Sequence, residues 1–271
     1  MNRFMPGACI VSLALAELIM LPVHLAAQNH QEQSGGARET MAPIALSAPS
    51  WQKGQYWVQH GDQLLVDFGG LERFRDADLK LGPPAAGENR VVFMGDSITE
   101  GWHLDQSFPG KPYINRGISG QTSPQMLVRF RQDLIDLGPK VVVILAGTND
   151  LAGNTGPMTL EQTEGNLESM AQLATASHIR VVLCSVLPSV DFPWNPGQDP
   201  APKILVLNQW IKAYAARDHY VYVDYYSAMK DAQGGLPPTL SKDGVHPLPA
   251  GYAIMAPLAE AGIEKALKGR E

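Results

Sequence analysis

The sequence predicts an α/β fold: a three-layer α/β/α sandwich built on a five-stranded parallel sheet. Apolar runs of strand length alternate along the chain with longer segments that have helical periodicity. This alternation indicates parallel strands joined by right-handed helical crossovers. The runs are apolar at consecutive positions, as in strands that helices cover on both faces. We expect the flavodoxin-like strand order 2-1-3-4-5.

Length and composition fit one globular domain behind an export signal. The chain has 271 residues, 45% of them hydrophobic and 18% charged, which is an ordinary globular balance. We expect residues 1–27 to form a signal peptide, residues 28–50 a flexible segment, and residues 51–271 one domain with its core in 90–268. The formal net charge of −6 gives no attraction for polyanions, so no nucleic-acid partner is expected.

The first 27 residues have the pattern of a signal peptide. Arg3 precedes an apolar stretch at residues 8–21, and the small residues Ala26 and Ala27 follow it. This pattern predicts cleavage near Ala27 and export to the periplasm or the medium, with no stable membrane insertion afterwards. A retained membrane anchor is the alternative, although the run is short for a spanning helix. Cys184 then remains the single cysteine, expected as a buried structural thiol.

The elements follow in order. Apolar runs predict strands at residues 91–94, 113–115, 141–145, 180–185 and 220–223. Helical spacing predicts helices at 122–137 and 159–174, one marked by Ile204, Leu207, Ile211 and Tyr214, and one from Tyr252 to near Gly269. Thr122 with Gln125, and Thr159 with Gln162, have the spacing of capping boxes.

Two flanking segments are less regular. Apolar residues between Leu64 and Leu79 predict a broken helix that packs across the domain, with Asp76 and Asp78 in solvent. Residues 188–202 contain five prolines, and we expect this irregular segment to shape the entrance to a site.

Ser97 is the candidate nucleophile. It follows the strand at 91–94 within Gly95-Asp96-Ser97, and the carboxyl ends of strands are where open α/β sheets place their ligands. A serine hydroxyl needs an adjacent base, and the base needs an orienting acid. His246 is the best candidate base, and Asp243 lies three positions before it, close enough for a turn to bring the carboxylate to the imidazole. Taken alone, Gly-Asp-Ser is also a common turn or helix cap.

An acyl-transfer site also needs donors for the oxygen that becomes negative. The backbone N–H groups of Ser97 and Gly120 and the side chain of Asn149 are the candidates, because the strands at 91–94, 113–115 and 141–145 each lead into one of them. Strand order 2-1-3 would bring these three ends together at one edge of the sheet.

Four stretches carry a family resemblance: Gly95-Asp96-Ser97-Ile98, residues 115–120 with Thr122, Gly147-Thr148-Asn149-Asp150, and Asp243-Gly244-Val245-His246-Pro247. In this order and spacing the chain resembles the SGNH hydrolase superfamily, the GDSL esterases, over about residues 90–265. Within it, the region near Leu187-Pro188 and the last stretch look most like the branch of platelet-activating-factor acetylhydrolase subunits and lysophospholipase-like esterases. The resemblance implies Ser97 as nucleophile, Asp243 and His246 as acid and base, and Gly120 and Asn149 in the oxyanion hole.

The predicted activity is hydrolysis of carboxylic esters, with small acyl groups such as acetyl on sugars or small alcohols as the favoured substrates. A lysophospholipase or thioesterase activity is the alternative. A metallophosphoesterase and a non-catalytic binding protein with the same shell are remoter alternatives. No metal or organic cofactor is implied. His103, near Ser97, either lines the pocket or lies on the surface. Trp102, Phe192 and Trp194 either form an acyl or sugar pocket or belong to the core.

Overall fold

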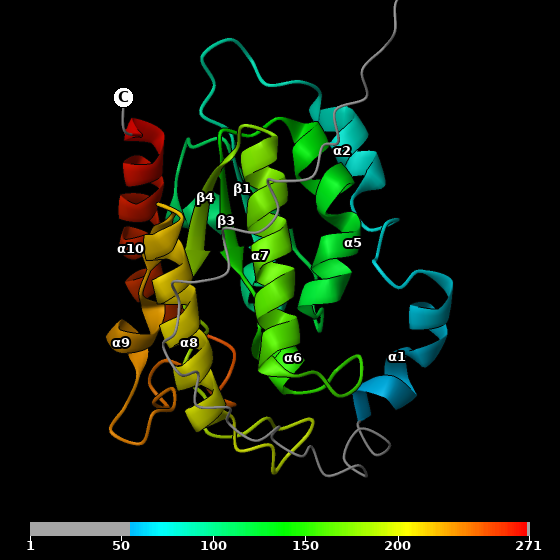
Figure 1. Cartoon of the computed structure of the whole chain (residues 1–271), viewed down its shortest axis with the longest axis vertical. Helices are drawn as coiled ribbons and strands as arrows, with labels where there is room; N and C mark the ends of the chain where they lie inside the picture. Colours follow the sequence, from blue (N-terminus) through cyan, green and yellow to red (C-terminus); the bar gives the residue numbers. More distant parts are fainter. Residues whose placement is uncertain (1–54, 270–271) are drawn as a thin grey trace, which may run out of the picture. The chain divides into compact units, whose positions relative to one another are not determined.

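The computed structural model describes residues 55–269, and the fold is a parallel sheet flanked by helices (Figure 1). The strands are β1 (Val91–Gly95), β2 (Tyr113–Gly117), β3 (Val141–Leu145), β4 (Arg180–Cys184) and β5 (Val221–Val223). The order is β2-β1-β3-β4-β5, and every neighbouring pair is parallel. The predicted fold class and strand order are confirmed. The expected signal peptide and flexible segment lie outside the described residues.

Helices cover both faces of the sheet. The principal ones are α5 (Ser123–Asp133), α7 (Leu160–Ala176), α8 (Pro200–Arg217) and α10 (Pro249–Lys268). Met94 and Ile144 pack in the core beneath α5, α7 and α8, the helices in front of the sheet in Figure 1. Phe93 and Val143, one position earlier in their strands, pack in the second core with α10. Side chains of a strand alternate between faces, so consecutive apolar residues supply both cores.

Side-chain caps start two helices where the spacing predicts them. The side chain of Gln162 accepts from the backbone N–H of Thr159 at 2.9 Å, and the backbone N–H of Gln162 donates to the Thr159 hydroxyl at 3.2 Å. At the start of α5, the side chain of Gln125 accepts from the backbone N–H of Thr122 at 3.0 Å. Each capping box satisfies amides that have no partner inside the helix.

The predicted helix at 122–137 is wrong in its last turn. Leu134 leaves the helical conformation at φ −134°, and a 3₁₀ turn, η2 (Ile135–Leu137), follows. Leu134 and Leu137 are both buried, and the tighter turn directs both side chains into the core before the chain enters β3. The last strand is also shorter than expected, because Tyr220 precedes β5.

The predicted broken helix between Leu64 and Leu79 consists of α1 (Gln55–Val66) and α2 (Arg75–Leu81), and its expected packing is only partly correct. Leu64 is buried, but Leu65 and Leu79 are 85% and 78% exposed. The expectation that Asp78 lies in solvent is wrong. Its carboxylate pairs with Arg116 of β2, and both side chains are largely buried. This ion pair, together with the Arg116 guanidinium over the ring of Phe74, holds the start of α2 against the domain.

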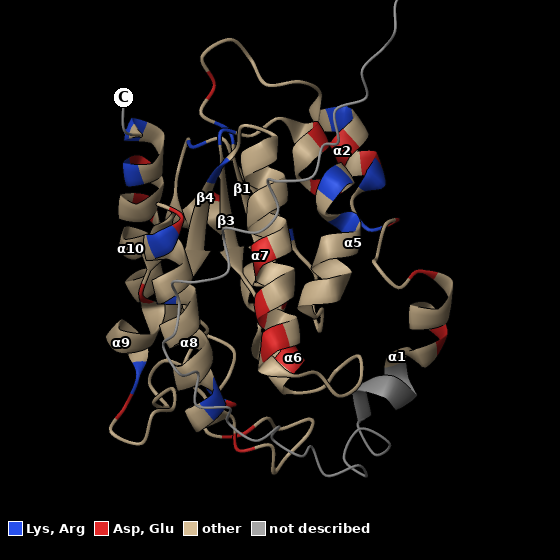
Figure 2. Cartoon of the chain, in the orientation of Figure 1, with Lys and Arg blue, Asp and Glu red and all other residues tan. Residues whose placement is uncertain are grey.

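The surface of the helices is mixed in charge. Acidic side chains lie along α7, whereas α2 and α10 carry both signs (Figure 2). Across residues 55–269, no helix combines the length and the apolar character needed to cross a bilayer. The irregular segment predicted at 188–202 ends earlier, because Pro200 already begins α8.

Candidate active site

The carboxyl ends of β1, β2 and β3 bring the candidate residues to one edge of the sheet. Ser97 begins the short helix α3 (Ser97–Glu100), directly after β1. Asp96 caps this turn, because its Oδ1 accepts the backbone N–H of Ile98 at 2.9 Å. The last residue of β2, Gly117, passes close to α3. A Cβ atom on Gly117 would lie 2.1 Å from the backbone nitrogen of Glu100, so this approach requires glycine.

Ser97, His246 and Asp243 form a continuous hydrogen-bonded chain. The Ser97 Oγ lies 2.8 Å from His246 Nε2, and His246 Nδ1 lies 2.6 Å from Asp243 Oδ2. The turn that carries both residues closes on itself, because Asp243 Oδ1 accepts the backbone N–H groups of Val245 and His246 at 3.0 and 2.8 Å. The sequence spacing predicted this pairing of Asp243 and His246.

The surroundings of Asp243 keep it ionised. Partial burial opposes the charge, but bonds from the His246 ring and from the backbone N–H groups of His246 and Val245 outweigh it and lower the pKa of Asp243 to about 2. A carboxylate in this position fixes the tautomer of the imidazole, since it accepts the proton on Nδ1 and leaves Nε2 free to accept from a hydroxyl.

Asp96 experiences the opposite effect one residue before Ser97. Its side chain is buried, and burial raises its pKa to about 7, against the backbone N–H of Ile98, which lowers it. Asp150 is buried next to this region and accepts the backbone N–H of Ser123. Its pKa is also raised by burial, although bonds from Ser123 oppose the shift.

Two backbone N–H groups are available beside the serine. Within residues 55–269, the N–H groups of Ser97 and Gly120 donate to no protein acceptor. Gly120 has φ +76°, a conformation that favours glycine. The preceding residue is tied down, because the backbone N–H of Ser119 donates to Glu100 at 2.9 Å. These two donors therefore lie in the segments that follow β1 and β2, at the edge of the sheet that carries Ser97.

Asn149 lies at the same edge, in α6 (Thr148–Leu151), and it is buried. Its Nδ2 donates to the carbonyl of Gln121 at 3.0 Å and to Asp96 Oδ2 at 3.3 Å. Both of its N–H groups thus have protein acceptors in this structure, in contrast to the backbone N–H of Gly120. Asn149 is held between the loops that follow β1 and β2.

Arg129 of α5 holds the end of β1 and the loop after β2 through hydrogen bonds to Gly95 and Gln121. The sequence did not indicate this role. Its fully buried guanidinium donates to the carbonyl of Gly95 at 3.1 Å, to Gln121 Oε1 at 2.6 Å and to Asp133 at 3.1 Å. Burial lowers the pKa of Arg129 to about 10, against the pull of Asp133. An arginine among the apolar positions of a predicted helix was the available signal.

A second residue missed from sequence, Asn154, lies in the turn after α6 and is buried. Its Nδ2 donates to the carbonyl of Gly120 at 2.9 Å and to Asn149 Oδ1 at 3.0 Å. Its position in the same strand-end loop as Asn149 was the available signal.

The aromatic residues considered for an acyl or sugar pocket differ in where they lie. Trp102 and Phe192 are buried in the two cores. Trp194 is half-buried, stacks on Phe192 and has its ring centroid 6.1 Å from that of His246. Trp194 is therefore the aromatic residue placed next to the candidate base, and it comes from the irregular segment expected at the entrance. His103 is exposed.

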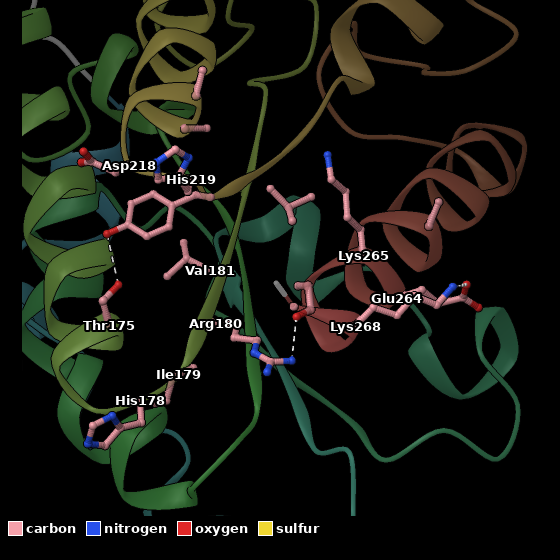
Figure 3. A pocket seen from close by; sticks show the side chains of 17 residues that line it. Thr175, His178, Ile179, Arg180, Val181, Asp218, His219, Glu264, Lys265 and Lys268 are labelled. Carbon is pink, nitrogen blue, oxygen red and sulfur yellow. Dashed lines mark hydrogen bonds and ion pairs between the residues drawn. The ribbon is translucent and has the colours of Figure 1, made fainter. Parts of the chain in front are cut away.

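A surface pocket of about 1070 Å³ lies elsewhere, at the amino ends of β4 and β5. Its lining includes Arg180 and Val221, the first residues of those strands. Figure 3 shows Arg180 directed at the last turn of α10, where its guanidinium donates to the carbonyl of Ala266 at 2.9 Å. In a parallel sheet this end is opposite to the end that carries Ser97.

Cys184 is buried, and burial raises the pKa of its thiol to about 12, as expected for a structural thiol. In the part of the chain that the structure describes, no three His, Cys, Asp or Glu side chains are grouped to hold a metal ion.

Comparison with known proteins identifies the family. The GDSL-like Lipase/Acylhydrolase family matches residues 93–254. A crystal structure of a GDSL-like lipase from Bacteroides thetaiotaomicron is 48% identical, with a TM-score of 0.71, over 73% of this chain and 99% of that one. Esterase TesA of Pseudomonas aeruginosa is 30% identical over 60% of this chain and 81% of its own length. Acetylxylan esterase of Geobacillus stearothermophilus is 27% identical over 69% of this chain and 98% of its own length. The chain therefore belongs to the GDSL-like lipase/acylhydrolase family and is a carboxylic ester hydrolase.

Proposed function

We propose that the protein is a serine esterase in which Ser97 is the nucleophile, His246 the general base and Asp243 the residue that orients it. The observation that carries this proposal is the unbroken chain from Asp243 through His246 to the Ser97 hydroxyl, with contacts of 2.6 and 2.8 Å. A serine hydroxyl becomes a nucleophile when a positioned base can take its proton.

The reaction would proceed in two halves. The Ser97 oxygen attacks the ester carbonyl carbon while His246 Nε2 takes the hydroxyl proton. The tetrahedral intermediate collapses, His246 returns that proton to the departing alcohol, and the acyl group remains on Ser97. Water then attacks the acyl-serine, again giving a proton to His246, and the carboxylic acid leaves as the Ser97 hydroxyl is restored.

The oxyanion would be bound by the backbone N–H groups of Ser97 and Gly120 and by Asn149. The lack of protein acceptors for the two backbone groups supports this assignment. Asn149 would contribute the N–H that now faces Asp96 at 3.3 Å, the longer of its two bonds, because longer hydrogen bonds are weaker. Preorganised donors of this kind stabilise charge that appears only in the transition state.

The substrates we propose are short acyl esters, above all acetyl groups on sugars or small alcohols. The similarity to an acetylxylan esterase supports this choice, as does the half-buried Trp194 beside His246, since an aromatic face can pack on a sugar ring. A lysophospholipase or thioesterase activity is the second candidate, and the similarity to Esterase TesA supports ester hydrolysis in general. We further propose that the protein is exported through residues 1–27, which the N-terminal mass of the secreted protein would test.

Ser97→Ala tests the mechanism. We expect kcat for p-nitrophenyl acetate to fall by at least about 10⁴-fold, as when a nucleophile is removed, with little change in Tm because one hydroxyl is lost. Ser169→Ala, which removes an exposed hydroxyl on α7, is the matched control and should keep full activity. Retained activity in Ser97→Ala would refute the mechanism.

The substrate proposal is tested separately with the unmodified enzyme. We expect kcat/KM to fall along p-nitrophenyl esters of increasing acyl length and acetylated xylooligosaccharides to be deacetylated. A preference for acyl chains of eight or more carbons, or for lysophospholipids, would favour the second candidate.

A further inference from the structure

Asn154 contacts two of the residues proposed for the oxyanion hole, Gly120 and Asn149. Its side chain is 3% exposed. Its two amide N–H groups donate to the Gly120 carbonyl at 2.9 Å and to Asn149 Oδ1 at 3.0 Å. A carboxamide has two N–H donors, so Asn154 spends both of them on residues assigned to the hole.

These two bonds orient the Gly120 carbonyl and the Asn149 carboxamide. Gly120 has no side chain and a positive φ, so its orientation depends on anchors on either side. One anchor is Glu100, which holds the N–H of Ser119, and the other is Asn154. Asn149 could rotate its carboxamide by half a turn and exchange donor for acceptor. The bond from Asn154 holds its Oδ1 and so keeps Nδ2 on the side of Asp96.

Trp194 completes the arrangement. Its indole Nε1 donates to Asn154 Oδ1 at 2.9 Å. The indole ring is itself braced, because it stacks on the fully buried Phe192 with centroids 5.3 Å apart. The same ring lies beside His246. Trp194, which lies in the segment before α8, therefore contacts both Asn154 and the proposed base His246.

We propose that Asn154 is a positioning residue of the oxyanion hole, and that the indole N–H of Trp194 holds Asn154 in place. This inference rests on the proposed function. Asn154 acts through Gly120 and Asn149, so its removal should weaken binding of the transition state more than binding of the ester.

The first experiment compares Asn154→Ala and Asn154→Asp with the wild type, using p-nitrophenyl acetate. A p-nitrophenyl phosphonate that labels the nucleophile counts folded sites, so kcat is expressed per labelled site. We expect kcat to fall about ten- to a hundred-fold, less than the loss of a donor itself, with KM within about three-fold. Asn154→Asp should be at least as impaired, because its carboxylate would face the Gly120 carbonyl.

The matched control is Asn195→Ala. Asn195 donates to the carbonyl of Ala152 at 2.7 Å. It therefore joins the segment before α8 to the turn after α6, as the Trp194–Asn154 bond does, but it does not contact Gly120 or Asn149. The kcat of Asn195→Ala per labelled site should stay near the wild-type value. An unchanged kcat in both Asn154 variants, a rise in KM in place of the fall in kcat, or an equal loss in Asn195→Ala would overturn the proposal. Activity retained in Ser97→Ala would instead refute the mechanism on which the proposal rests.

The second experiment is Trp194→Phe, which keeps the aromatic ring and removes the indole N–H. It also serves if Asn154→Ala fails to fold. We expect kcat per labelled site to fall about three- to ten-fold, since Asn154 keeps both bonds to the hole but loses the bond that orients it. A wild-type kcat would overturn the role assigned to Trp194.

Discussion

Asp243 and Asp96 belong to the same candidate site, but their surroundings act on the two carboxyl groups in opposite directions. Asp243 lies in a surface turn with its side chain 40% exposed, and the donors around it lower its pKa to about 2. Asp96 is 1% exposed, and burial raises its pKa to about 7. The difference shows that the candidate site has two parts: an exposed turn with the ionised Asp243 and the proposed base, and a buried polar network around Asp96 and Asn149.

A substitution at Asp243 or His246 should change activity with little effect on folding, because both side chains are about 40% exposed. A substitution in the buried network should change both, because each lost side chain leaves a buried polar partner without a hydrogen bond.

Asp243→Asn should have the largest effect and should act on activity alone. An amide facing Nδ1 favours the wrong tautomer of His246, and the corresponding change in serine proteases lowers kcat about 10⁴-fold. Tm should stay close to that of the wild type, since the asparagine Oδ1 can still accept from the backbone of Val245 and His246. Kinetics and a thermal melt on the same sample measure both quantities. A large drop in Tm would show that the turn is not independent of the buried network.

Asn149→Ala should impair both activity and folding. The loss of one oxyanion donor lowers kcat about 10²- to 10³-fold. The carbonyl of Gln121 and the amide of Asn154 also lose a partner, which costs about 1–3 kcal/mol for each buried group left unpaired. Denaturant unfolding with kcat per labelled site separates the two effects. Full activity would remove Asn149 from the hole, and unchanged stability would contradict its place in the network.

The pH dependence of activity tests His246 as the proposed base. Asp243 stays ionised above about pH 2, and a general base can accept a hydroxyl proton only in its neutral form. We expect kcat/KM to rise with pH, by up to about tenfold per unit, between about pH 5 and 8. A flat profile across this range would count against His246 as the base.

The pH dependence of stability should come in part from Asp96. Its pKa is raised to about 7 in the folded protein, whereas an unfolded aspartate titrates near 3.9. Between these values the folded state binds more protons, so this carboxyl makes the free energy of unfolding decrease as pH rises. In Asp96→Asn the free energy of unfolding should decrease less with pH. A change in stability that is the same at every pH does not affect this comparison. Denaturant midpoints at several pH values measure the decrease, and parallel curves for the two proteins would show that Asp96 titrates normally.

The same division explains what could be predicted from the sequence. Buried strands appear as apolar runs such as 141–145, and a base with its acid appears as Asp243 and His246 three positions apart. These are local patterns. Asp78, Arg129 and Asn154 depend on partners 38, 34 and 34 positions away. Periodicity carries no information about such pairs, because they form only after the strands and helices are in place.

The turn of Asp243 and His246 has one further consequence. The proposed acid and base are aligned by bonds within four consecutive residues, and an antiparallel bridge between Ser241 and Pro247 closes the surrounding segment. In the proposed mechanism, the only long-range alignment that the triad needs is the approach of this segment to Ser97, 149 positions earlier. Lengthening a loop between the two segments should therefore be tolerated wherever that approach is preserved, which makes the triad robust to insertions.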